Sequence, residues 1–167
     1  MHARNNMASI NSIKDLLANE IKDLYSAEKQ LTKAIPKMAK GANDPALQNA
    51  FKGHLAETLD QVKRLEEVAG LLGIKPAGKK CVGMEGCIEE GGEALEETGA
   101  PSVLDLGIIG AGRRVEHYEI AGYMTAIGLA GQMREQEVVA LLTQSLKEEE
   151  AADEKLRKIA GALLKAQ

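Results

Sequence analysis

The stretch LLTQSLKEEEAADEKL, residues 141–156, decides the fold class of this chain. Apolar and acidic residues follow one another there at spacings of three and four, which is the period of a helix face. The predicted face consists of Val139, Leu142, Leu146, Glu149, Asp153, Leu156, Ala160 and Leu163. It is apolar at both ends and acidic in the middle. The stretch therefore predicts a long helix over about 135–165, with carboxylates at the depth of a core.

Three further segments have the same helical spacing of apolar residues, over about 11–40, 45–72 and 101–130. Ser12 is a predicted N-cap of the first segment. Asp44 caps the second segment ahead of Pro45, and Gly73 ends it. Each of the four helices has roughly 28 residues and would be about 42 Å long. Matched lengths are typical of a four-helix bundle.

The connections predict how the four helices run. The first two helices and the last two are joined by short loops, so each pair forms an antiparallel hairpin. Residues 73–100 are too long for a hairpin, and MEGCIEEGGEALEE, residues 84–97, predicts a short extra helix within them. A long crossover makes the second and third long helices parallel, which is the ferritin-like topology.

The composition agrees with an all-α protein. The chain has 167 residues with one Phe, three Tyr and no Trp, so its core must be aliphatic. Pro is scarce and runs of β-branched residues are nearly absent, which argues against sandwiches and barrels. The length suits a single domain, expected over 11–167, with residues 1–10 as a flexible tail.

Charge and cysteine content exclude several classes of protein. A net charge of −4 and a pI near 5.5 disfavour nucleic-acid binding, which needs a basic face. No run of about 18 apolar residues is present to span a membrane, and the start MHARNNMASI lacks the apolar region of a signal peptide. Cys81 and Cys87 do not make a disulfide framework. We therefore expect a cytoplasmic protein with reduced thiols.

Carboxylates lie near the midpoint of every predicted long helix. They are Glu28, Glu57, Glu116 with Glu119, and Glu149 with Asp153. Because the midpoints of antiparallel helices share one level, these carboxylates would converge in the core, where each unpaired one costs several kcal/mol. The helix faces and their flanks offer too few Lys or Arg to neutralise them. Two divalent metal ions would do so, with His54 as a nitrogen ligand.

Five strings carry a family resemblance: YSAEKQL (25–31), HLAET (54–58), CVGMEG (81–86), VEHYEIAGY (115–123) and LKEEEAADEKL (146–156). From about residue 10 to 163 the chain closely resembles the YciF/YciE-like family of small ferritin-like stress proteins. The resemblance implies a four-helix bundle with a rubrerythrin-like dimetal site, a homodimer and an association with stress. Carried over, the metal-ligand candidates are Glu28, His54, Glu57, Glu116, Glu119, Glu149 and Asp153.

One departure concerns the order of the ligands. Ferritins and rubrerythrins place Glu-x-x-His on two helices, whereas this chain has His54-x-x-Glu57 on the second long helix and no histidine on the last. Iron is the first expectation for such a centre, and because the predicted ligands are mostly oxygens, manganese fits nearly as well. Asp153 has a second interpretation, as a hydrogen-bond acceptor beside the ligands. His117 is expected beside the site or at the surface, and Tyr123 could hydrogen-bond a ligand.

Two functions are compatible with these observations. The first is a metal-binding stress protein whose dinuclear centre reacts with dioxygen or peroxide, with oxidase-type or peroxidase-type activity. The second is a structural or interaction bundle without enzymatic activity, in which the site binds metal for stability only or binds none. The expected partners are a second copy of the chain and, in the first case, a small oxidant.

Overall fold

The structure is a computed structural model, and it describes residues 9–166. Its helices are α1 (Ile13–Gly41), α2 (Pro45–Leu72), α3 (Val82–Glu96), α4 (Pro101–Gln132) and α5 (Gln136–Lys165), and the described residues contain no strand. The prediction of an all-helical chain is confirmed, with four long helices close to their predicted bounds and a short one in the crossover. The expected tail over 1–10 lies outside the described residues except for its last two.

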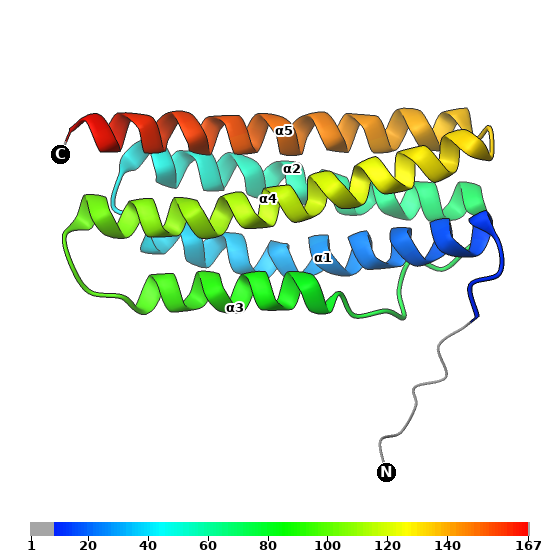
Figure 1. Ribbon diagram of the computed structural model, residues 1–167, viewed down its shortest axis with the longest axis horizontal. Coiled ribbons are helices and arrows are strands. Elements are labelled where there is room, and N and C mark those ends of the chain that lie inside the picture. Colours follow the sequence, from blue (N-terminus) through cyan, green and yellow to red (C-terminus); the bar gives the residue numbers. More distant parts are fainter. Residues whose placement is uncertain (1–8, 167) are drawn as a thin grey trace, which may run out of the picture.

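The four long helices form a bundle in which each is antiparallel to both of its neighbours (Figure 1). α1 packs on α2 and α4, and α5 packs on the same two helices from the other side. The crossover makes α2 and α4 run in the same direction, as the sequence predicts. α3 lies outside the bundle against α1 and α4, so it covers part of one face.

The helix ends agree with the sequence signals. The Ser12 hydroxyl accepts a hydrogen bond from the backbone N–H of Asp15 at 3.1 Å and caps α1. Asp44 accepts from the N–H of Leu47 at 2.9 Å and caps α2. Gly73 ends α2 with φ of 66°, a left-handed conformation that glycine adopts without a steric cost. These local bonds set where each helix begins and ends.

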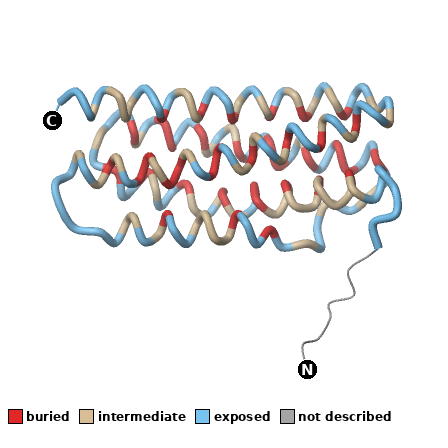
Figure 2. The backbone as a smooth tube through the Cα atoms, viewed as in Figure 1, coloured by how far each residue is buried: buried red, intermediate tan, exposed pale blue. Residues whose placement is uncertain are grey.

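The core consists of two apolar clusters, one toward each end of the bundle. One contains Ile35, Leu47, Phe51, Met84, Ile109 and Leu156, and the other contains Leu17, Ile21, Leu65, Tyr123, Val138 and Leu142. Between them lies a layer of buried polar side chains, namely Glu28, His54, Thr58, Gln61, Glu116, Glu119, Ser145 and Glu149. Buried residues thus continue along the whole bundle axis (Figure 2), and its middle is polar.

The inner face of α5 differs from the predicted one. Its buried residues are Val138, Leu142, Ser145, Glu149, Ala152 and Leu156. Three of the eight predicted residues are among them, whereas Val139, Leu146 and Asp153 are half-buried at the edge. Ser145 and Ala152 are small, so turning them inward lets α5 approach its neighbours closely. The predicted face of α5 was therefore wrong at Val139, Leu146 and Asp153, and Asp153 does not lie in the core.

Candidate metal centre

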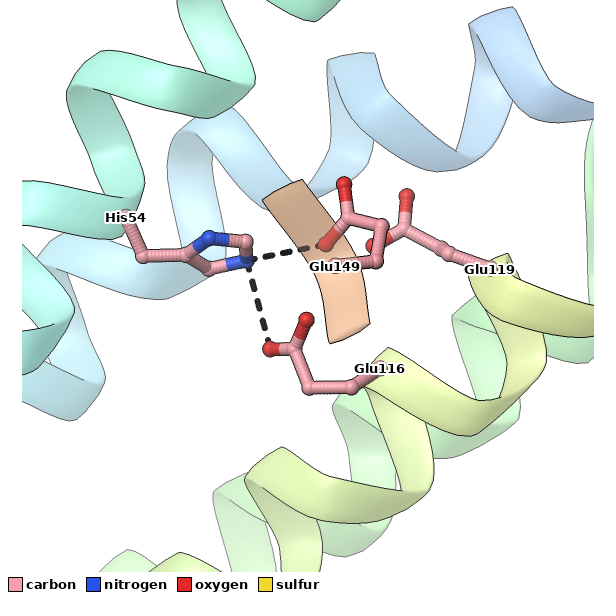
Figure 3. A group of neighbouring side chains, drawn as sticks. All are labelled: His54, Glu116, Glu119 and Glu149. Atoms are coloured by element: carbon pink, nitrogen blue, oxygen red, sulfur yellow. Dashed lines mark ion pairs between the residues drawn. The ribbon is translucent and has the colours of Figure 1, made fainter. Parts of the chain in front are cut away.

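Three helices bring one imidazole and three carboxylates together in the polar layer. His54 comes from α2, Glu116 and Glu119 from α4, and Glu149 from α5. Each of these four residues offers one potential ligand atom, and the four atoms all lie within 4.8 Å of one another. All four side chains are buried. Figure 3 shows the four side chains pointing toward one another. We call these four residues the central group.

The His54 ring contacts carboxylates through both nitrogens. Its Nε2 atom lies 3.2 Å from Glu116 Oε1 and 3.7 Å from Glu149 Oε2, the two ion pairs drawn in Figure 3. Its Nδ1 atom lies 3.4 Å from Glu57 Oε2. Burial by itself lowers the pKa of His54, but the neighbouring carboxylates, Glu116 first, outweigh burial and raise that pKa well above its usual range. These contacts hold the His54 ring between the carboxylates of Glu57, Glu116 and Glu149.

Glu28 of α1 is fully buried beside the central group. The Tyr123 hydroxyl donates a hydrogen bond of 2.5 Å to its Oε1 atom, which is the contact with a ligand candidate that the sequence left open. Burial raises the pKa of Glu28 to about 7, although the bond from Tyr123 acts in the opposite direction. Coulombic contributions from Glu28 also raise the pKa of Glu119 and Glu149, after the larger effect of burial. Glu28 is therefore electrostatically part of the same site.

Several buried oxygens of this site have no hydrogen-bond partner among the described residues. They are both carboxylate oxygens of Glu119 and of Glu149, Oε2 of Glu28 and Oε2 of Glu116. Leaving buried polar atoms unpaired costs about 1–3 kcal/mol each, and more when they are charged. Carboxylate oxygens and imidazole nitrogen are ligands that iron and manganese accept. The residues present therefore fit a divalent metal site.

Glu57 and Asp153 lie outside the central group. The Glu57 side chain is 39% exposed and reaches His54 from the solvent side. Asp153 accepts hydrogen bonds from Arg113 Nε at 2.7 Å and Nη2 at 3.2 Å, and His117 Nε2 lies 3.2 Å from its Oδ2. The bonds from Arg113 lower the pKa of Asp153. The structure thus gives Asp153 a cationic partner that spacing along the sequence does not show, and it places His117 at the surface.

Gln61 is a polar residue of the layer that the sequence analysis did not single out. It is fully buried, and its Nε2 donates to Glu148 Oε2 at 3.0 Å. Because a carboxylate oxygen only accepts, the amide nitrogen must face Glu148, which Arg64 holds through two hydrogen bonds. The Gln61 carbonyl oxygen is then an acceptor without a partner among the described residues. An amide within the otherwise mostly apolar face of α2 was the signal that could have found it.

Fold and site together define a class, all-helical bundles with a buried carboxylate and imidazole group that could hold a metal ion. The sequence profile of the domain of unknown function DUF892 matches residues 12–167, and the chain belongs to this family. Protein YciF of Escherichia coli strain K12 is 41% identical over 153 residues, which are 91% of this chain and 92% of YciF. The predicted resemblance to YciF-like proteins is confirmed.

Solved structures agree with this assignment. The crystal structure of the E. coli stress protein YciF has a TM-score of 0.91 and 40% identity, covering 95% of this chain and all of that one. YcfI of Rhodopseudomonas palustris, provisionally described as a structural protein, has a TM-score of 0.87 and 40% identity over 92% of this chain and 98% of its own. A protein of Xanthomonas campestris, at 22% identity and a TM-score of 0.73, shares the fold over 93% of this chain and 95% of its own.

Within the described residues, none of the helices is both long enough and apolar enough to cross a membrane. Cys81 and Cys87 are free thiols, as expected. Cys81 is buried at the start of α3, and Cys87 is half-buried within it.

Proposed function

We propose that this chain is a ferritin-like stress protein whose dinuclear, carboxylate-rich centre reacts with dioxygen or peroxide. The observation that carries the proposal is the set of buried carboxylate oxygens around His54 that have no hydrogen-bond partner within residues 9–166. The arrangement of the four long helices, with α2 and α4 parallel, is the one that ferritin-like bundles use. The description of E. coli YciF as a stress protein supports the association with stress.

Charge favours two ions rather than one. Glu28, Glu57, Glu116, Glu119 and Glu149 carry five negative charges when ionised. With a neutral His54, one divalent ion leaves a net charge of −3 in the site and two leave −1. The central group would hold the metal, with Glu28 and Glu57 extending the ligand set on either side. Iron is proposed first, and manganese is the second choice for so oxygen-rich a site.

The bound metal would supply electrons, and the side chains would orient its ligands, carry protons and exclude water. Dioxygen would take up two electrons from two ferrous ions together with two protons and leave as hydrogen peroxide, or hydrogen peroxide would take up the same electrons and protons and leave as two waters. Tyr123 orients Glu28 through its short hydrogen bond. Glu57 reaches from solvent to His54 Nδ1 and can pass protons between them. The two apolar clusters exclude water from both ends.

Anaerobic titration of the purified protein with Fe(II) and with Mn(II) tests the proposal. The wild type should bind about two ions per chain, and the double variant Glu57→Ala with Glu149→Ala should bind neither metal. Glu150→Ala is the matched control, because Glu150 neighbours Glu149 on α5 but is exposed, and it should bind as the wild type does. Stopped-flow mixing of the loaded protein with dioxygen and with peroxide then follows the oxidation.

The opposite result supports the alternative, a structural or interaction bundle without enzymatic activity. No metal uptake by the wild type, together with a higher melting temperature of the double variant, would show that the carboxylates only repel one another. The provisional description of YcfI as a structural protein is the observation that favours this alternative.

We also propose that the chain forms a homodimer in the cytoplasm, without nucleic acid or a membrane as partner. The family resemblance supports the dimer, and the net charge of −4 disfavours nucleic acid. Light scattering on the eluted protein should give twice the chain mass of 17.9 kDa. A monomer across the accessible concentration range would contradict the dimer.

A further inference from the structure

A cavity of about 30 Å³ lies between α3 and the metal centre. Its wall is mostly apolar and includes Leu31, Phe51, Ile88 and Val115 from four different helices. His54 and Glu116 also line it, so the cavity directly adjoins the central group. A space of this size holds about one or two molecules as small as water.

The space exists partly because residue 91 is a glycine. A Cβ at Gly91 would lie 3.6 Å from Met38 Sδ and 3.8 Å from the Cβ of Ala111, which are ordinary contacts. Alanine would therefore fit, and it would favour the helix over glycine. Gly83 of the same helix differs, since a Cβ there would lie 2.5 Å from the Tyr118 ring. Sterics explain Gly83 but not Gly91, where the chain leaves room that a methyl group could fill.

We propose that this cavity binds dioxygen and delivers it to the metal centre. The inference rests on the proposed function and narrows its oxidant to dioxygen. Apolar space takes up small apolar molecules, and the wall of this cavity is apolar except at His54 and Glu116. Hydrogen peroxide would have to give up hydrogen bonds to water on entering a cavity with so apolar a wall, whereas dioxygen forms almost no hydrogen bonds with water. Dioxygen in the cavity lies next to His54 and Glu116.

Xenon binding tests the cavity without any metal. Crystals of the metal-free wild type under xenon pressure should show a xenon atom between α3 and His54. Gly91→Val should abolish it, and Gly91→Ala, which meets only ordinary contacts, should reduce its occupancy. Gly92→Val is the matched control on the same helix, because a Cβ at Gly92 would have no described neighbour within 4 Å, and it should keep the xenon. A wild type without xenon, or xenon retained in Gly91→Val, would overturn the assignment.

Oxidation kinetics test the choice of oxidant. In protein loaded with Fe(II), Gly91→Val should slow oxidation by dioxygen by about tenfold, with Fe(II) stoichiometry and the rate with hydrogen peroxide unchanged. Gly92→Val should match the wild type with both oxidants. An equal loss of both rates in Gly91→Val would refute dioxygen selectivity. A wild type that binds no iron would refute the proposed function and with it the delivery of dioxygen to a metal centre. The xenon experiment would then decide separately whether the cavity takes up small apolar molecules.

Discussion

At the scale of residues, the Tyr123 hydroxyl donates the hydrogen bond that Glu28 Oε1 accepts beside the central group. Both side chains are fully buried, so the Glu28 oxygen has no access to water if the hydroxyl is removed. Tyr123→Phe should lower the free energy of unfolding of the metal-free protein by about 1–3 kcal/mol. Urea unfolding at neutral pH measures it.

Tyr25→Phe is the matched control for that variant. The Tyr25 hydroxyl donates to Glu66 at 2.9 Å, but this bond lies at the exposed surface. Its loss should change the free energy of unfolding by less than about 0.5 kcal/mol. Equal effects of the two variants would show that burial does not strengthen the bond between Tyr123 and Glu28.

A comparison of Asp153 with Glu149, also at the residue scale, tests which carboxylates bind metal and which only lie near the site. Arg113 already engages both of its oxygens, whereas both oxygens of Glu149 lack a hydrogen-bond partner among the described residues. Glu149→Gln should weaken Fe(II) or Mn(II) binding by about tenfold or more, and Asp153→Asn by less than about threefold. Anaerobic titration of the two variants measures both affinities. A similar loss in both would restore Asp153 as a ligand, as the family resemblance implies.

At the scale of elements, a polar contact fixes where α3 begins. Cys81 Sγ and the Tyr118 hydroxyl both donate to Asp23 Oδ2, at 3.1 and 2.8 Å, and Lys79 Nζ lies 3.0 Å from Asp23 Oδ1. Burial raises the pKa of Cys81, so this thiol stays protonated and able to donate. The start of α3 is thereby tied to α1 through Asp23 and to α4 through Tyr118.

Gly83→Ala tests that attachment. The new Cβ would lie 2.5 Å from the Tyr118 ring and 2.8 Å from its hydroxyl, so the ring must leave its bonds to Asp23 and Cys81. We expect a loss of about 1–3 kcal/mol in the free energy of unfolding, against the helix preference for alanine. Gly86→Ala, in the same helix with nothing within 4 Å, should stabilise instead. Thermal melts compare the two, and a stabilising Gly83→Ala would show that Tyr118 is not held.

At the scale of the whole molecule, the buried acidic layer sets how the stability of the metal-free protein depends on pH. Glu28 has a folded pKa of about 7 and an ordinary value of 4.5, so between these pH values the folded state holds a proton that the unfolded chain has lost. Stability therefore falls as pH rises through this window, by about 3 kcal/mol for Glu28 alone. The raised pKa of His54 acts in the same direction above about pH 6.5.

Denaturant unfolding of the metal-free protein at about pH 5 and pH 7.5 checks this dependence. We expect higher stability at the lower pH, and Glu28→Gln should reduce the difference. Asp153 and Glu154, whose pKa values are lowered by arginine neighbours, lose their contribution only as pH falls below about 4, outside this window. A free energy of unfolding that rises from pH 5 to pH 7.5 would contradict the inference that buried carboxyl groups such as Glu28 are protonated in the folded protein.

Much of the site could be predicted because α2 and α4 are regular over their whole length. His54, Glu116 and Glu119 lie on faces that the three-and-four spacing identifies correctly, and all three are buried. The same spacing was wrong on α5, where Leu146 is more apolar than Ser145 but lies further out. Spacing locates a face only to within about one residue, or 100° of rotation. That is the difference between Asp153 in the core and Asp153 at the edge.

The helices, their caps, the direction of the crossover and the acidic level of the bundle could all be predicted, because they depend on local bonds and on periodicity within one segment. Which carboxylate oxygens lack a hydrogen-bond partner among the described residues follows only from how the helices pack. Arg113 lies 40 positions from Asp153 and Arg64 lies 84 from Glu148, and only packing brings them together. The cavity beside His54 also results from packing, since residues from four helices line it. Contacts between segments depend on how the helices rotate and approach, which no single segment encodes.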